Sequence, residues 1–212
     1  DDAPQLLLRH HLMQAKLAGF MQSPQYVFQR YPSADKSLPA RYARSISMFR
    51  KGDTKNAIPI IDSLIRDIPE NPYFWELKGQ ALLEGGAPAK ALASLRQANK
   101  LLPNSGLIQI LYAQALIATE DRANIKQALN LLTLAKKTER DSVDVYKYSA
   151  LAYGYLNDLP RAELATAEMA MMQGDTALAS EKAKRVIGQF KHGSPEWMKA
   201  NDVLNFTSKE RN

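Results

Sequence analysis

The sequence predicts an all-α fold, built as a solenoid of antiparallel helix pairs, and three observations support this prediction. Ala and Leu supply 56 of the 212 residues, whereas Val and Ile supply only 16, and unbranched side chains favour helix over strand. Apolar residues recur at helical spacing, with breaks every 12 to 17 residues. Small residues return after about 34 residues, the length of one helix pair. No segment shows sustained period-two alternation, so we predict no strands.

Capping signals mark the expected ends of the helices. A capping side chain followed by proline predicts a helix start at Ser23-Pro24, Asn71-Pro72 and Ser194-Pro195. Leu38-Pro39 and Leu159-Pro160 place proline in the same position without an ideal cap. Helix stops are predicted by glycine at Gly52-Asp53, Gly85-Gly86 and Gly174-Asp175. Pro59 falls inside the expected helix 54–67, so we expect a kink or a late start there.

The segment 72–105 carries the repeat most clearly. Its small and apolar residues fall at the offsets of the tetratricopeptide repeat (TPR): Trp75, Gly79, Leu82, Gly86, Ala91, Leu95, Ala98 and Pro103. Two helices approach closely only where small side chains face each other, and larger ones fill the space around that contact. This resemblance implies a right-handed superhelix with a concave groove.

The same phase continues in the neighbouring segments. The key alanines are Ala57, Ala91, Ala128, Ala162 and Ala179, at spacings of 34, 37, 34 and 17 residues. The last spacing is half a repeat, so we predict that helix 160–172 closes one pair and opens the next. The alternative is an irregular helical bundle with alanine-rich packing.

These boundaries predict three regions. Residues 1–36 form N-terminal helices that lead into the solenoid, residues 37–192 form about four TPR units, and residues 193–212 form a C-terminal capping helix and tail. Trp197 is expected to cover the last pair, because terminal repeats need a cap. Three methionines on one helix, Met169, Met171 and Met172, are either ordinary packing or an adaptable binding patch.

Composition and charge exclude several classes of function. The chain has no cysteine, which excludes a disulfide scaffold, a thiolate zinc site and a cysteine nucleophile. It has no run of about 18 uncharged apolar residues, so we predict no transmembrane segment. Residues 1–56 hold nine Lys or Arg against four acids, which indicates either a solvated basic face or a surface for an acidic partner. No basic run is interleaved with aromatics as a nucleic-acid groove requires, so we expect no nucleic-acid partner.

The candidate binding residues follow from the repeat. In the TPR family the first helix of each pair lines the concave face, and by resemblance a set of side chains points into the groove of this chain. The set for binding a peptide or protein is Tyr42, Phe49, Arg50, Tyr73, Glu76, Gln80, Glu84, Gln114, Lys147 and Tyr155. Aromatic and arginine anchors would supply the affinity, and polar groups would fix the register of the bound peptide. We expect about half of the groove positions to be packing residues instead.

Four stretches are similar to a narrower group, the C-terminal part of BepA-like bacterial periplasmic zinc metalloproteases. They are LLLRHHLMQAKLAGF (6–20), SLPARYARSISMFRKGD (37–53), NPYFWELKGQALLEGG (71–86) and GSPEWMKANDVLNF (193–206). In that family a catalytic domain with HExxH precedes a TPR tail. The resemblance implies a periplasmic location, a zinc-dependent parent protein, and contact with outer-membrane protein assembly machinery or its substrates.

The chain itself has no HExxH; its histidines are His10, His11 and His192. Neighbouring histidines on a helix point about 100° apart and cannot act as an i, i+4 ligand pair. We therefore expect no catalytic residue, metal ligand or cofactor in this chain, and the family's catalytic residues map to no position here. The N-terminus, Asp1-Asp2-Ala3-Pro4, reads like the middle of a longer chain.

Three functional hypotheses remain. The first is a non-catalytic interaction domain forming the tail of a periplasmic metalloprotease. The second is a free-standing TPR adaptor in any compartment. The third is a helical-repeat enzyme or nucleic-acid binder that uses the basic N-terminal quarter.

Overall fold

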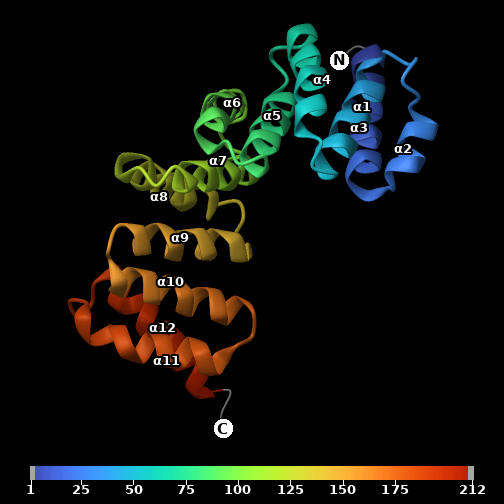
Figure 1. Cartoon of the computed structure of the whole chain (residues 1–212). Coiled ribbons are helices and arrows are strands. Elements are labelled where there is room, and N and C mark those ends of the chain that lie inside the picture. The colour runs from blue at the N-terminus through green and yellow to red at the C-terminus, as the bar shows by residue number, and fades with distance from the viewer. Residues whose placement is uncertain (1–2, 210–212) are drawn as a thin grey trace. The chain divides into compact units, whose positions relative to one another are not determined.

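The computed structural model describes residues 3–209, and within this range the regular structure is entirely helical (Figure 1). The chain divides after Pro103 into two compact units. The predicted all-α fold is confirmed. We describe each unit by itself, and the predicted division into regions 1–36, 37–192 and 193–212 stays a prediction.

The first unit contains six helices, blue to green in Figure 1. They are α1 (Ala3–Met21), α2 (Pro24–Arg30), α3 (Leu38–Arg50), α4 (Thr54–Asp67), α5 (Pro72–Glu84) and α6 (Pro88–Leu101). Helices α3 and α4 pair, as do α5 and α6, while α1 lies along α3. Their shared core includes Ile46, Ile61, Leu64 and Phe74, none of which has measurable exposure to solvent. Burial of such side chains stabilises the unit by about 1.5–3 kcal/mol each.

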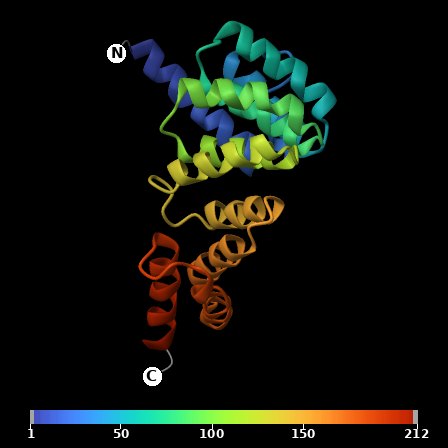
Figure 2. The same cartoon turned by 90° about the vertical axis from the view of Figure 1, so that its left-hand side faces the viewer.

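The second unit contains six α-helices and one 3₁₀ turn. They are α7 (Gly106–Ala118), α8 (Arg122–Ala135), α9 (Val143–Tyr155), α10 (Leu159–Met172), α11 (Thr176–Val186), η1 (Ile187–Gln189) and α12 (Pro195–Lys209). Helix α10 packs against both α9 and α11, as the half-repeat spacing predicts. Helix α12, red in Figure 2, packs against α10 and α11.

Most of the predicted helix starts are confirmed by capping hydrogen bonds. The side chains of Ser23 and Asn71 accept from the backbone N–H groups of Tyr26 and Tyr73. The two starts that lack an ideal cap in the sequence prediction are capped one residue earlier, because Ser37 and Asp158 accept from N–H groups of the first turn. Proline then stands at the second helical position rather than the first.

Helix α4 starts at Thr54, so the late start expected from Pro59 is wrong, and Pro59 lies inside the helix. A proline here removes the N–H that would bond the carbonyl of Lys55. Both residues are exposed, so water can satisfy that carbonyl. The kink stays a prediction.

The phased small residues lie where the helices meet. Ala57, Ala91, Ala128 and Ala179 are fully buried, while Ala162 is half-buried. Gly79 of α5 faces the Leu95 side chain of α6 so closely that a Cβ atom at Gly79 would overlap it. The small residue of the repeat at Gly79 therefore marks the place where α5 and α6 approach closely.

The last pair is covered differently from the prediction. Trp197 is half-buried, and its ring lies 4.2 Å from that of His192 between centroids. The α12 residues that join the core of α10 and α11 are Ala200 and Val203. Trp197 thus packs at the start of α12 and does not belong to that core cluster.

One of the basic residues in the N-terminal quarter is structural. Arg44 is only 4% exposed, and its guanidinium donates to the backbone carbonyls of Tyr31, Pro32 and Asp35 at 3.2, 2.7 and 2.8 Å. Burial lowers the pKa of Arg44 from its ordinary value, but a guanidinium stays protonated in proteins. Arg44 therefore holds the segment between α2 and α3 against α3 and is not part of a basic surface.

Candidate functional site

Four of the ten predicted binding residues come together in the first unit. A cavity of about 150 Å³ is lined by Tyr42, Tyr73, Glu76 and Gln80, together with Lys16, Phe20 and Leu77. We call these seven residues the unit-1 groove. They come from α1, α3 and α5. The structure thus places part of the predicted set around one concave site.

The register of α5 explains why its residues share this site. Tyr73, Glu76, Leu77 and Gln80 are spaced at i, i+3, i+4 and i+7, which is one face of a helix. The start of α5 is fixed by Asn71, whose side-chain oxygen accepts from the Tyr73 N–H at 3.0 Å. Tyr42 of α3 meets α5 edge-on, with 5.1 Å between the ring centroids of Tyr42 and Phe74.

Helix α1 forms the other wall, which the sequence prediction missed. Lys16 Nζ lies 3.4 Å from Glu76 Oε2 and 4.8 Å from the centroid of the Tyr73 ring. Phe20 lies one turn further along the same face, and its ring meets Phe49 edge to face at 6.4 Å. The signal in the sequence was the i, i+4 spacing of a cation and an aromatic residue, since these two side chains share a face.

The close fit of α1 against α3 depends on Gly19. A Cβ atom at Gly19 would stand 2.7 Å from Cβ of Ile46, closer than real Cβ atoms approach. The carbonyl of Gly19 accepts from Nη1 of Arg50 at 3.3 Å. Arg50, a predicted groove residue, therefore bonds the end of α1.

Two predicted groove residues are mainly packing residues. Tyr42 and Phe49 are 3% and 4% exposed and belong to the core of the first unit. Burial raises the pKa of the Tyr42 phenol strongly, with a smaller contribution from the charge of Glu76, so Tyr42 stays neutral. Tyr73, in contrast, is 45% exposed and can contact a partner. Glu84 is exposed and accepts from Gln80 Nε2 at 2.9 Å.

The three predicted residues in the second unit do not line a cavity together. Gln114 is half-buried on α7, while Lys147 and Tyr155 are exposed on α9. The Tyr155 hydroxyl donates to Glu120 Oε1 at 3.2 Å, and this hydrogen bond raises the pKa of Tyr155. Lys147 Nζ lies 3.9 Å from Asp144 Oδ1. Their role in binding stays a prediction.

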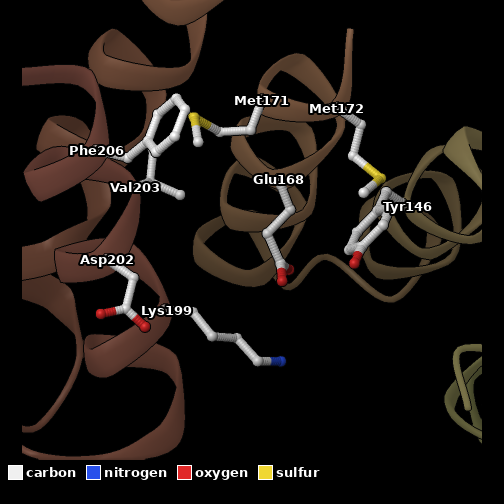
Figure 3. Close-up of a pocket in the computed structure, with 8 residues that line it drawn as sticks. All are labelled: Tyr146, Glu168, Met171, Met172, Lys199, Asp202, Val203 and Phe206. Atoms are coloured by element: carbon white, nitrogen blue, oxygen red, sulfur yellow. The ribbon is translucent and has the colours of Figure 1, made fainter. Parts of the chain in front are cut away.

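A larger cavity, of about 410 Å³, lies in the second unit and was not predicted as a site. Its lining residues are Tyr146, Glu168, Met171, Met172, Lys199, Asp202, Val203 and Phe206, which we call the unit-2 cavity. Figure 3 shows Met171, Val203 and Phe206 gathered on one side, with Met172 beside Tyr146. Glu168 and Lys199 extend toward the same space.

Lys136, the residue that follows the last turn of α8, supports one edge of this cavity. Its Nζ lies 3.1 Å from Glu168 Oε1 and 4.5 Å from the centroid of the Tyr146 ring. Burial opposes the charge of Lys136, but the Tyr146 hydroxyl and Glu168 outweigh it and raise its pKa. Lys136 thus remains charged and neutralises Glu168.

The described residues offer no catalytic metal centre. Across residues 3–209 no group of three His, Asp or Glu side chains lies close enough to hold a metal ion. His10 and His11 have ring centroids 6.1 Å apart, and His10 Nε2 lies 2.9 Å from the Gln14 amide nitrogen. These residues do not fit the zinc site of a metalloprotease. In the same range no helix is long and apolar enough to span a bilayer.

Comparison with known proteins agrees with the helix-pair geometry. The family model described as "Cytochrome c-type biogenesis protein H TPR domain" matches residues 61–177, which are 117 of the 212 residues. No curated protein matches the chain at a significant level.

Solved TPR proteins share the fold. MamA from Desulfovibrio magneticus RS-1 aligns with a TM-score of 0.61 at 16% identity, covering 84% of this chain and 97% of that one. YrrB, described as a TPR protein with an unusual peptide-binding site, aligns with a TM-score of 0.58 at 19% identity. The alignment covers 70% of this chain and 75% of YrrB. TTC0263 from Thermus thermophilus aligns with a TM-score of 0.51 at 16% identity. The alignment covers 80% of this chain and 100% of TTC0263. At these identities the likeness establishes the TPR fold alone.

Proposed function

The chain belongs to the family of cytochrome c-type biogenesis protein H TPR domains, and on that premise we propose that it is a non-catalytic domain that binds a polypeptide segment in the unit-1 groove. The observation that carries this proposal is the convergence of Tyr73, Glu76 and Gln80 beside a cavity of about 150 Å³. That volume suits a single side chain of a partner, held as an anchor between helices.

The chemistry of the groove favours a basic residue of the partner next to an apolar one. Lys16 already occupies such a position, with its ammonium between the Glu76 carboxylate and the Tyr73 ring. An ammonium gains from both the opposite charge and the ring face. A partner lysine or arginine that displaces the Lys16 ammonium would meet the same two groups. Gln80 offers both a donor and an acceptor to the partner's backbone.

Selection of a peptide followed by titration tests this proposal. A random peptide library displayed on phage is selected with the full chain, and the selected peptide is titrated calorimetrically. We expect Tyr73→Ala and Glu76→Gln each to weaken binding by about 1–2 kcal/mol, as for anchor residues of other interfaces. That corresponds to roughly 5- to 30-fold in Kd.

Matched controls separate the groove from a general effect of the substitution. Tyr26→Ala removes a tyrosine of similar exposure, 43% against 45% for Tyr73, and Glu70→Gln removes an exposed carboxylate outside the groove. Both should leave Kd within twofold. Equal losses in the controls, or a selected peptide that ignores the groove variants, contradict the proposal.

A finer proposal concerns the parent protein. The similarity of residues 6–20, 37–53, 71–86 and 193–206 to BepA-like proteases supports a TPR tail that serves outer-membrane protein assembly in the periplasm. A free-standing TPR adaptor fits the family and the fold equally well. The coding sequence upstream of Asp1 distinguishes them: an HExxH motif supports the tail, and a start codon next to Asp1 supports the adaptor.

A further inference from the structure

The unit-2 cavity shares no residue with the unit-1 groove, and its size is that of a ligand site. Its volume of about 410 Å³ falls within the roughly 300–1,000 Å³ of ligand pockets, although it is an open hollow that leaves part of a ligand in solvent. It is formed by α9, α10 and α12 of one compact unit. Its occupant can therefore be inferred from its own lining.

The apolar side of the cavity is adaptable and accessible. Val203 is buried and belongs to the core, which fixes the base of this side. Above it, Met171 is half-buried, and Met172 and Phe206 are 39% and 47% exposed. Methionine is unbranched and polarisable, so it adjusts to different apolar shapes. This side suits one large aliphatic or aromatic side chain.

The polar side is close to electrically neutral. Glu168 is neutralised by Lys136, which leaves one cation, Lys199, and one anion, Asp202, both on α12. Among the described residues neither of these two has an oppositely charged atom within 4.0 Å. Figure 3 shows the Lys199 side chain extending into the space below Glu168. The polar side therefore offers free donors and free acceptors but no net charge.

This balance selects among ligands. A charged ligand of either sign would meet two ammoniums, Lys136 and Lys199, and two carboxylates, Glu168 and Asp202. Its charge would therefore gain no net attraction. A peptide backbone in extended conformation carries one N–H donor and one carbonyl acceptor per residue and no charge. In a helix those groups are already hydrogen-bonded to each other. An extended segment therefore has more free backbone groups to bond with the polar side of the cavity.

We propose that the unit-2 cavity is a second binding site, which takes an extended polypeptide segment carrying one large apolar residue. The apolar side chain rests against Met171, Val203 and Phe206. The backbone on either side of it donates to Asp202 or Glu168 and accepts from Lys199. This inference goes beyond the unit-1 groove and does not depend on it.

The methionine methyl groups allow a direct test in the full chain. The protein is labelled with ¹³C at its seven methionine methyl groups and titrated with an uncharged peptide, acetyl-Gly-Gly-Phe-Gly-Gly-amide. We expect saturable shifts of the Met171 and Met172 signals, while Met13 and Met48 of the first unit stay unchanged. The same peptide with alanine in place of phenylalanine should cause no saturable shift.

Variants on α12 connect the shifts to the cavity. Phe206→Ala should raise Kd about fivefold or more, while Met198→Ala, an exposed residue of the same helix outside the cavity, should leave it within twofold. Asp202→Asn keeps an acceptor but gives the site a net positive charge, so a peptide with glutamate beside phenylalanine should become the tightest ligand. Circular dichroism confirms that each variant is folded.

Three results overturn the proposal. One is the absence of Met171 and Met172 shifts at millimolar peptide. Another is equal weakening by Phe206→Ala and Met198→Ala. The third is tighter binding of a charged peptide than of the neutral one by the unaltered protein. None of these results bears on the unit-1 groove, whose test uses Tyr73 and Glu76.

Discussion

Gly79 offers the sharpest test of the packing between helix pairs. It lies in α5, and a Cβ atom there would overlap Cγ and Cδ2 of Leu95 in α6. Leu95 has no exposed surface, so it cannot swing into solvent to make room. The substitution Gly79→Ala therefore either moves the two helices apart or forces Leu95 into a different rotamer.

The size of the effect follows from two opposing contributions. Alanine in a helix interior gains about 1 kcal/mol over glycine through its lower backbone entropy cost. An extra carbon in a filled core costs about 1–3 kcal/mol. The net expectation is a loss of about 1 kcal/mol in the free energy of unfolding.

Gly154 supplies the matched control. It lies in α9, and nothing stands within 4 Å of an added Cβ atom there. Gly154→Ala should therefore stabilise the protein, by up to about 1 kcal/mol. The difference between the two variants isolates the overlap with Leu95, about 1–3 kcal/mol.

Urea unfolding followed by circular dichroism at equal protein concentration measures both variants. If Gly79→Ala is as stable as Gly154→Ala, then Leu95 has space to move and our account of the α5–α6 contact is wrong.

Three further predictions concern residues outside the α5–α6 contact. Arg44→Leu leaves three backbone carbonyls near α3 without their donor and should lower the free energy of unfolding by about 3 kcal/mol. Arg44→Lys should not restore the lost stability, because an ammonium lacks the planar set of donors of a guanidinium. The carboxylate of Asp175 caps α11 by accepting from the Leu178 N–H at 3.0 Å. Asp175→Ala removes this cap and should lower the free energy of unfolding by about 1 kcal/mol in the same urea assay. The pKa of Glu196 lies below its ordinary value of 4.5 because of hydrogen bonds from its own backbone N–H and from Arg161. A lowered folded-state pKa stabilises the protein above the unfolded value, and this stabilisation is lost as pH falls through the folded value. The stability difference between the unaltered protein and Glu196→Gln should therefore be full at neutral pH and vanish in acid, and a difference that grows in acid contradicts this reasoning.

The helices could be predicted from the sequence because their signals are local. Capping at Ser23 and Asn71 depends on a side chain and an N–H two or three residues away, and phased alanines such as Ala91 and Ala128 mark buried positions. The caps at Ser37 and Asp158 were missed because proline was expected at the first helical position, whereas it occupies the second.

The site could be predicted only in part, because its missing members come from distant segments. The pattern of α5 predicts that Tyr73, Glu76 and Gln80 share a face. The i, i+4 spacing of Lys16 and Phe20 puts them on one face of α1, but that spacing does not show that Lys16 reaches Glu76, 60 residues away. Arg44 shows the same limit. Its charge counted toward a basic surface, and only the folded chain shows that it is buried against carbonyl groups.

The unit-2 cavity was not foreseen for a related reason. The sequence leaves Met171 and Met172 as either packing residues or an adaptable patch, and a cavity also needs an opposing wall. That wall is Lys199, Asp202 and Phe206 of α12, and no repeat spacing relates α12 to α10.

Site-specific photo-cross-linking tests whether the unit-1 groove holds a polypeptide segment. A benzophenone side chain is introduced in place of Tyr73 and, separately, in place of Tyr26, and each protein is irradiated with the phage-selected peptide. We expect a covalent adduct at position 73 that excess unlabelled peptide suppresses, and none at position 26. Equal adducts at the two positions, or none at position 73, would contradict the proposal.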